Sequence, residues 1–143
     1  MNDIEANKAV VRRFLDEVVS GGKLDVLDNI MAKDLKWHGG SFGELTSLEQ
    51  FKQMMPAFFT AFPDLRVKAE DVLADGDRVI VRHHWTGTNK GPFFGMPPTG
   101  KSVKVAGMNI YRLAGGKIAE EWWGEDIYGL MVQLGVVKAP GQG

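Results

Sequence analysis

The sequence predicts an α+β domain. Helices come first and a curved antiparallel sheet follows, with the N-terminal helices packed on its concave face to form a cone-shaped barrel. The first half carries apolar residues at helical spacing, whereas the second half holds four long strand-like stretches separated by turn-forming residues. Such turns suit hairpins better than the helical crossovers of a parallel sheet. A chain of 143 residues without a linker-like segment is expected to form one domain, residues 1–143.

The N-terminal segment is predicted to form a long helix and then a short one. Asn2 and Asp3 are typical helix-capping residues, and Phe14 belongs to the apolar residues that follow at helical spacing. Gly21-Gly22 is expected to end the helix, because glycine adopts the left-handed conformation without a Cβ clash. The short helix is expected over residues 24–31.

A third helix is predicted after a short strand at residues 35–38. Ser47 followed by Gln50 is typical of a capping box at a helix start. Phe58 lies on the apolar face of this helix among several Met and Phe residues. Pro56 falls inside the helical pattern and is expected to kink or interrupt it, because proline lacks the backbone donor.

Four strands and a last short helix are predicted for the second half. The strands are expected at residues 65–73, 78–88, 101–113 and 117–125. The last helix is expected to begin at Asp126, which suits an N-cap. If the twisted sheet curls around the helices, a cavity remains between the two layers, and such a cavity is the default ligand site.

Composition narrows the possible partners and chemistry. Lys and Arg total 17 against 18 Asp and Glu, so no excess positive charge is available for phosphates and nucleic acid is not expected as a partner. The chain has no cysteine and three histidines, so no metal site is expected. No apolar run approaches the about 18 residues of a membrane span, and the N-terminus lacks a signal-peptide core. The expectation is a cytoplasmic protein without a membrane partner.

The motifs of the second half resemble a known family. Residues 87–101, GTNKGPFFGMPPTGK, are similar to the GTHxGxxxGxxPTG signature of SnoaL-like polyketide cyclases. Gly116-Lys117-Ile118, Trp122 and Gln133-Leu134-Gly135 fit the same pattern. The resemblance implies the nuclear-transport-factor-2-like cone fold, a homodimer formed through the sheet, and chemistry without a cofactor. This fold hosts enzymes and non-catalytic binding proteins alike.

The residues that the resemblance would make catalytic are replaced in this sequence. Well-studied members of the family close a ring by intramolecular aldol condensation, with an Asp as acid/base and a nearby His. The Asp position corresponds to Trp123 and the His position to Asn109. Two further pocket positions, an Asn and a Tyr in the family, fall near Trp37 and Val18. Other side chains would therefore have to transfer protons.

Glu121 is the preferred acid/base. A hairpin that places Asn109 opposite Glu121 directs alternate residues, Glu125 among them, into the cavity. Burial among aromatic side chains would raise the pKa of a carboxyl group and suit proton transfer near neutral pH. The alternative is a structural glutamate that is solvated or paired with Arg82 or Arg112.

His38 is the second catalytic candidate, because it follows Trp37 on the short strand at the expected cavity mouth and its ordinary pKa lies near neutrality. His83 and His84 are consecutive on a strand and must face opposite ways, and the sequence leaves open which one enters the cavity. Residues expected to bind the ligand are Trp37, Asn109, Trp123, Arg82, His84, Phe14 and Phe58.

These residues give the first interpretation, an enzyme of the SnoaL-like family without a cofactor. It would act on a hydrophobic, carbonyl-bearing small molecule by acid/base proton transfer in a cyclisation, isomerisation or hydration. The alternative is a non-catalytic small-molecule-binding protein of the same fold.

Overall fold

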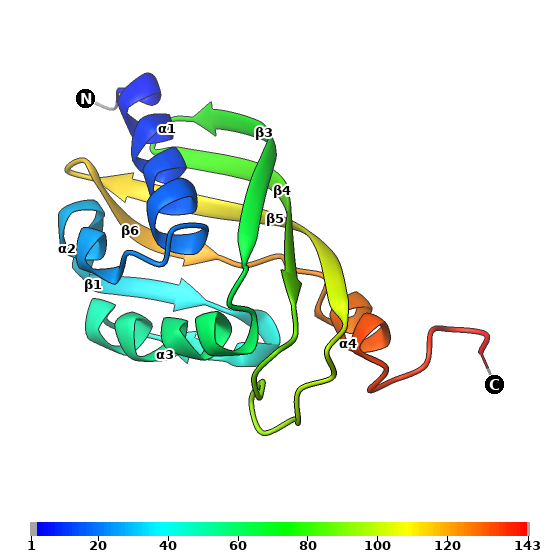
Figure 1. Cartoon of the computed structure of the whole chain (residues 1–143). Helices are drawn as coiled ribbons and strands as arrows, with labels where there is room; N and C mark the ends of the chain where they lie inside the picture. The colour runs from blue at the N-terminus through cyan, green and yellow to red at the C-terminus, as the bar shows by residue number, and fades with distance from the viewer. Residues whose placement is uncertain (1–2, 143) are drawn as a thin grey trace.

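Six strands form one curved, unclosed sheet in the computed structural model, which describes residues 3–142 (Figure 1). The strand order across the sheet is β2-β1-β6-β5-β4-β3. The strands are β1 (Met31–His38), β2 (Glu44–Leu45), β3 (Arg66–Asp75), β4 (Arg78–Thr88), β5 (Ser102–Ala114) and β6 (Lys117–Trp122). The α+β class and the curved sheet are confirmed.

The prediction of a wholly antiparallel sheet is wrong for one pair of neighbours, because β1 and β6 run parallel. Successive connections reverse the chain between β3, β4, β5 and β6, so each of these pairs is antiparallel. No hairpin links β1 to this group. The helix α3 (Leu48–Ala61) separates β1 from β3 in the sequence, so the direction of β1 is not fixed by a turn.

The helices lie mainly on one side of the sheet (Figure 1). In chain order they are α1 (Ile4–Arg13), the π-helical segment η1 (Phe14–Val19), the 3-10 turn η2 (Leu24–Val26), α2 (Leu27–Ile30), the 3-10 turn η3 (Gly40–Phe42), α3 and α4 (Ile127–Leu134). Asp3 caps α1 by accepting a hydrogen bond from the amide of Ala6. The predicted role of Asn2 lies outside the described residues.

The third helix differs from its prediction at one position. Ser47 caps α3 as expected, with its Oγ 3.2 Å from the amide nitrogen of Gln50. The helix nevertheless continues through Pro56 without a break. Pro56 is exposed, so water can satisfy the carbonyl that a proline leaves without a donor.

The hairpin between β5 and β6 has a different register from the predicted one. Tyr111, not Asn109, lies opposite Glu121, and a bulge follows between Arg112 and Leu113. The difference is two residues along the strand. Because side chains alternate with a period of two, this shift leaves every side chain on its predicted face.

The core fills the space between the helices and the concave face of the sheet. Phe14 from η1 and Phe51 from α3 meet there, with ring centroids 6.1 Å apart. Strand β4 buries alternate residues such as Val79 and Val81 on this side, whereas its other face carries charged groups. Of the helices between residues 3 and 142, none combines the length and apolarity that a membrane crossing requires.

Candidate active site

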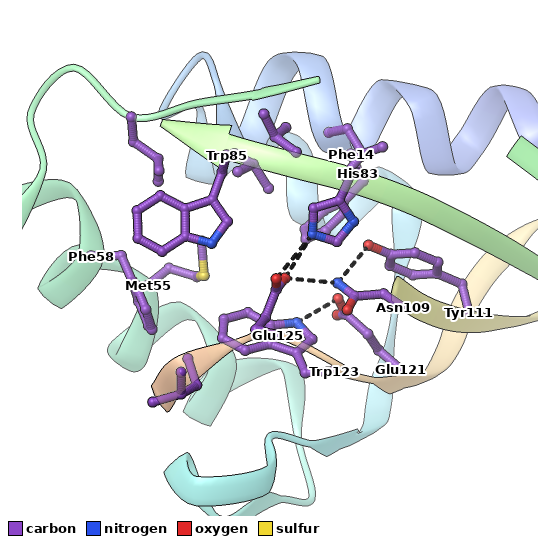
Figure 2. A pocket seen from close by; sticks show the side chains of 15 residues that line it. Phe14, Met55, Phe58, His83, Trp85, Asn109, Tyr111, Glu121, Trp123 and Glu125 are labelled. Atoms are coloured by element: carbon purple, nitrogen blue, oxygen red, sulfur yellow. Dashed lines mark hydrogen bonds and ion pairs between the residues drawn. The ribbon is translucent and has the colours of Figure 1, made fainter. Parts of the chain in front are cut away.

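An apolar cavity lies between η1, α3 and the concave face of the sheet, and Figure 2 shows the side chains that line it. Its volume is about 50 Å³, space for a few water molecules. Most of the lining is apolar: Phe14, Leu15, Val19, Met55, Phe58, Leu65, Val67, Trp85, Trp123 and Ile127. The polar side chains are His83, Asn109, Tyr111, Glu121 and Glu125.

Sheet register brings these polar side chains together. Tyr111 lies opposite Glu121 across β5 and β6, and Asn109 lies opposite Val81 across β4 and β5. Each of the polar residues occupies an inward-facing position of its strand or of the segment that follows β6. Hydrogen bonds connect these side chains (Figure 2), and those of Glu125 with His83 and with Asn109 join residues that are distant in the sequence.

Gly107 makes room for the contact between His83 and Glu125. It lies opposite His83 on β4 and forms an isolated bridge with Glu125. A Cβ atom at position 107 would lie 2.0 Å from Glu125 Oε2 and 2.9 Å from His83 Nε2. The carboxylate and the imidazole thus meet over a glycine because no side chain occupies that space.

Glu121 is a buried carboxyl group, and one of its two oxygens has no hydrogen-bond partner among residues 3–142. Its side chain is fully buried, and Trp123 Nε1 donates a hydrogen bond to Oε1 over 2.7 Å. Burial raises the pKa of Glu121 to about 8, the hydrogen bond from Trp123 opposes that rise, and the negative charge of Glu125 adds to it. Glu121 is therefore mostly protonated at neutral pH.

The position of this proton follows from the hydrogen bonds. Oε1 of Glu121 accepts from Trp123, whereas Oε2 has no partner among residues 3–142. A protonated carboxyl group carries one O–H donor. The proton is accordingly assigned to Oε2, which leaves Glu121 able to donate to a ligand. Burial, followed by the charge of Glu121, also holds the pKa of Tyr111 well above its usual value, so its phenol stays neutral.

Glu125 and His83 form a second acid/base unit. His83 Nε2 lies 2.8 Å from Glu125 Oε1 and 3.1 Å from Oε2, and Asn109 Nδ2 donates to Oε1 over 3.3 Å. The amide of Asn109 is itself oriented, since its Oδ1 accepts from the backbone of Gly124. A carboxylate can only accept, so the His83 proton belongs on Nε2. In the neutral ring, Nδ1 then keeps a free lone pair, and no partner within residues 3–142 occupies it.

Comparison with known proteins places the chain in a family. Its sequence matches the family model of the SnoaL-like polyketide cyclases over residues 9–134, most of the chain. The chain belongs to this family. Among curated proteins, none matches the sequence.

Solved structures share the SnoaL-like fold. A protein of Jannaschia sp. CCS1, assigned as a SnoaL-like polyketide cyclase, is 29% identical with a TM-score of 0.87, over 96% of this chain and 97% of that one. A protein of Acidithiobacillus ferrooxidans, assigned as a polyketide cyclase, is 30% identical with a TM-score of 0.80, over 94% and 97%. An epoxide hydrolase of Mycobacterium tuberculosis, 17% identical with a TM-score of 0.73 over 91% and 90%, shares the fold alone.

Several predicted site residues do line the cavity of this SnoaL-like chain. Glu121, Asn109, Trp123, Phe14 and Phe58 are all part of its wall. Trp123 and Asn109 occupy the positions that the resemblance gives to the family's acid and histidine. In this chain the carboxyl side chains of Glu121 and Glu125 stand two positions to either side of Trp123 in the same cavity wall.

His38 does not reach the cavity. Its side chain projects from the opposite face of β1, where Glu120 and Glu44 bind its two ring nitrogens and Trp122 stacks on it. The reason is alternation: Trp37 points inward, so its successor points outward. Trp37 does not line the cavity either, because it packs against the Trp123 ring at 4.7 Å between centroids and supports that ring.

Arg82 and His84 also lie on the outer face. Arg82 pairs with Asp71 over 2.7 Å, and His84 lies 2.6 Å from Glu70. His83 is therefore the histidine that enters the cavity, and the choice of His84 as a ligand-binding residue is corrected. On β4, His83 stands two residues from each of the apolar residues Val81 and Trp85, and this spacing could have identified the inward face.

Within the described part of the chain, no group of three or more His, Asp or Glu side chains is arranged to hold a metal ion.

Proposed function

We propose that this SnoaL-like protein catalyses proton transfer on a hydrophobic, carbonyl-bearing small molecule without a cofactor. One observation carries the proposal: a protonated carboxyl group and a carboxylate–histidine pair meet at the polar end of a single apolar cavity. Two ionisable groups held in different protonation states are what acid/base catalysis requires.

Each group has a role in forming an enol. His83 Nδ1 accepts the proton from the carbon next to the substrate carbonyl, and Glu125 fixes the orientation of the ring through Nε2. As that C–H bond breaks, its electron pair forms a C=C bond and the carbonyl oxygen takes the proton of Glu121 Oε2. The enol then takes a proton back at another carbon, which is isomerisation, or attacks a second carbonyl, which closes a ring.

The test measures hydrogen–deuterium exchange at carbons next to a carbonyl. The protein is incubated in D2O with ketones of increasing size, from acetone through cyclohexanone to 2-tetralone, and exchange is followed by NMR. We expect exchange above the buffer rate, and a loss of about 100-fold or more in both Glu121→Gln and His83→Gln. His84→Gln is the matched control, since His84 lies on the other face of the same strand.

The control variant should exchange at the wild-type rate. Exchange no faster than in buffer for every ketone would overturn the proposal, and so would wild-type exchange in His83→Gln.

A non-catalytic binding protein is the second candidate function. It is favoured by the mostly apolar lining and by the presence of Trp123 and Asn109 at the family's catalytic positions. Binding of the ketones without any exchange would select this candidate.

A further inference from the structure

A second recess opens beside the cavity. The turn at residues 39–41, which follows β1, forms one side of it, and residues 125–128 at the start of α4 form the other, with Trp123 between them. Its volume is about 280 Å³. We call this recess the vestibule.

The vestibule adjoins the cavity through shared side chains. Trp123, Glu125 and Ile127 line both spaces. The cavity alone, at about 50 Å³, is smaller than the roughly 300–1,000 Å³ of ordinary ligand sites. A substrate whose carbonyl end reaches Glu121 must therefore place most of its remaining atoms outside the cavity. The vestibule is one adjoining space; another recess, which shares His83 and Glu125 with the cavity, opens beside Arg82 on the outer face of the sheet.

The charges of the vestibule restrict what it can hold. Among residues 3–142, Glu125 and Asp126 are the carboxylate side chains that line it, and no Lys, Arg or His of this part of the chain does. The remaining polar groups include the hydroxyls of Ser41 and Tyr128, and the latter donates to the carbonyl of Lys138. A carboxylate or phosphate placed here would face two acidic side chains without a cation to balance it, whereas hydroxyl or ammonium groups would find acceptors.

We propose that the vestibule binds the non-reacting part of the substrate, and that this part carries hydrogen-bond donors such as hydroxyl or ammonium groups and no negative charge. The inference rests on the proposed function, because it takes the cavity as the place of reaction. It adds a substrate class that the cavity itself does not define.

The test compares three ketones that differ only in the end of a tail. Each is an acetophenone with a para three-carbon alkoxy chain that ends in a hydroxyl, an ammonium or a carboxylate group. Calorimetric titration should give dissociation constants at least tenfold lower for the hydroxyl and ammonium compounds than for the carboxylate. Equal affinities, tighter binding of the carboxylate, or no binding of any of the three at millimolar concentration would overturn the proposal.

Two variants locate this preference in the vestibule. Asp126→Asn removes one charge but keeps an oxygen for the N-cap, whose Oδ1 accepts from the amide of Gly129 over 2.9 Å. This variant should reduce the ratio of the carboxylate compound's dissociation constant to that of the ammonium compound several-fold. Ser41→Lys should tighten binding of the carboxylate compound. Asp75→Asn, at the last residue of β3, is the matched control and should change neither the ratio of the dissociation constants nor the affinity for the carboxylate compound.

If Asp126→Asn leaves this ratio of dissociation constants unchanged, the proposal that the vestibule binds the tail is also overturned. The exchange assay of the wild-type protein, run on the same three ketones, separates this inference from the proposed function. A tail preference that persists while no ketone exchanges hydrogen would leave the vestibule intact and reject catalysis. Hydrogen exchange without any tail preference would support catalysis and reject the vestibule proposal.

Discussion

Glu120 and Glu121 are neighbours on β6, and strand alternation sends them to opposite faces of the sheet. Burial would raise the pKa of Glu120, but hydrogen bonds from His38 and Arg112 outweigh it and hold that pKa below its usual value. Inside, burial dominates and raises the pKa of Glu121 to about 8. Two identical side chains thus differ in charge at neutral pH because one has cationic partners and the other has none.

The two histidines of β4 differ in how deeply their pairs with carboxylates are buried. His83 and His84 each contact a carboxylate, but the side chains of His83 and Glu125 are only 2% and 7% exposed, against 21% and 31% for His84 and Glu70. An exposed pair of this kind contributes little, since water and salt screen it. The buried pair is shielded from water and salt, so its electrostatic attraction is screened far less.

The largest expected effect is on the pH dependence of stability through Glu121. A carboxyl group whose pKa is raised from 4.5 to about 8 contributes stability below pH 4.5 and loses it as pH rises through the folded value. Wild type should therefore lose stability relative to Glu121→Gln by about 1.4 kcal/mol per pH unit over this range, on the order of 4 kcal/mol in total. Urea unfolding of both proteins at pH 5, 6.5 and 8 measures this difference.

Glu120→Gln is the matched control and should show the opposite sign. A lowered pKa contributes stability above the unfolded pKa that disappears as pH falls. This variant should be up to about 1 kcal/mol less stable than wild type at pH 7, with the deficit vanishing in acid. A Glu121→Gln variant that loses most stability at pH 8 would contradict the burial argument and indicate a structural ion pair.

A smaller effect is expected from filling the space over Gly107. Gly107→Ala places a Cβ atom against Glu125 and His83, so overpacking should cost about 1–3 kcal/mol. Displacement of His83 and Glu125 should also reduce the hydrogen–deuterium exchange that the protein catalyses in ketones. Chemical denaturation and the exchange assay measure the two effects.

Ala106→Ser, on the exposed face of the same strand, is the control and should change stability by less than about 0.5 kcal/mol. Wild-type exchange in Gly107→Ala would show that the pair does not depend on this space.

The smallest effect concerns His38 on the outer face. A hydrogen bond to Glu120 is the main reason that its pKa is raised, and Glu44 adds to the rise. The resulting stability is present below pH 6.5 and is lost as pH rises through the folded pKa. Because a third of the side chain is exposed, the contribution should stay under about 1 kcal/mol. NMR titration of the imidazole should give a pKa above that of a histidine peptide, and a value at or below it would refute the prediction.

The sequence identified the fold because local signals agreed with one another. Ser47 and Asp126 cap their helices as predicted, and strand alternation correctly placed Glu121, Trp123 and Asn109 in the cavity. These features depend on neighbouring residues or on a period of two. Both can be inferred without knowledge of tertiary contacts.

Features that depend on distant contacts were not predictable in the same way. The parallel pairing of β1 with β6 has no turn to indicate it, and the bulge after Arg112 changes the register without a distinctive residue. The inward side of β4 is different in kind, because the sequence does carry a signal for it. Val81 and Trp85 flank His83 at a spacing of two, which places His83 and not His84 on the apolar face of the strand.

Three successive inward positions, Glu121, Trp123 and Glu125, give the cavity wall a row of equivalent attachment points. Residues two apart on a strand point the same way and stand about 7 Å from each other. Moving an acid from the middle of the row to either end keeps it in the cavity but aims it at a different atom of a bound molecule. Under the proposed function, such a move would change the carbon from which a proton is removed while the fold and the cavity stay as they are.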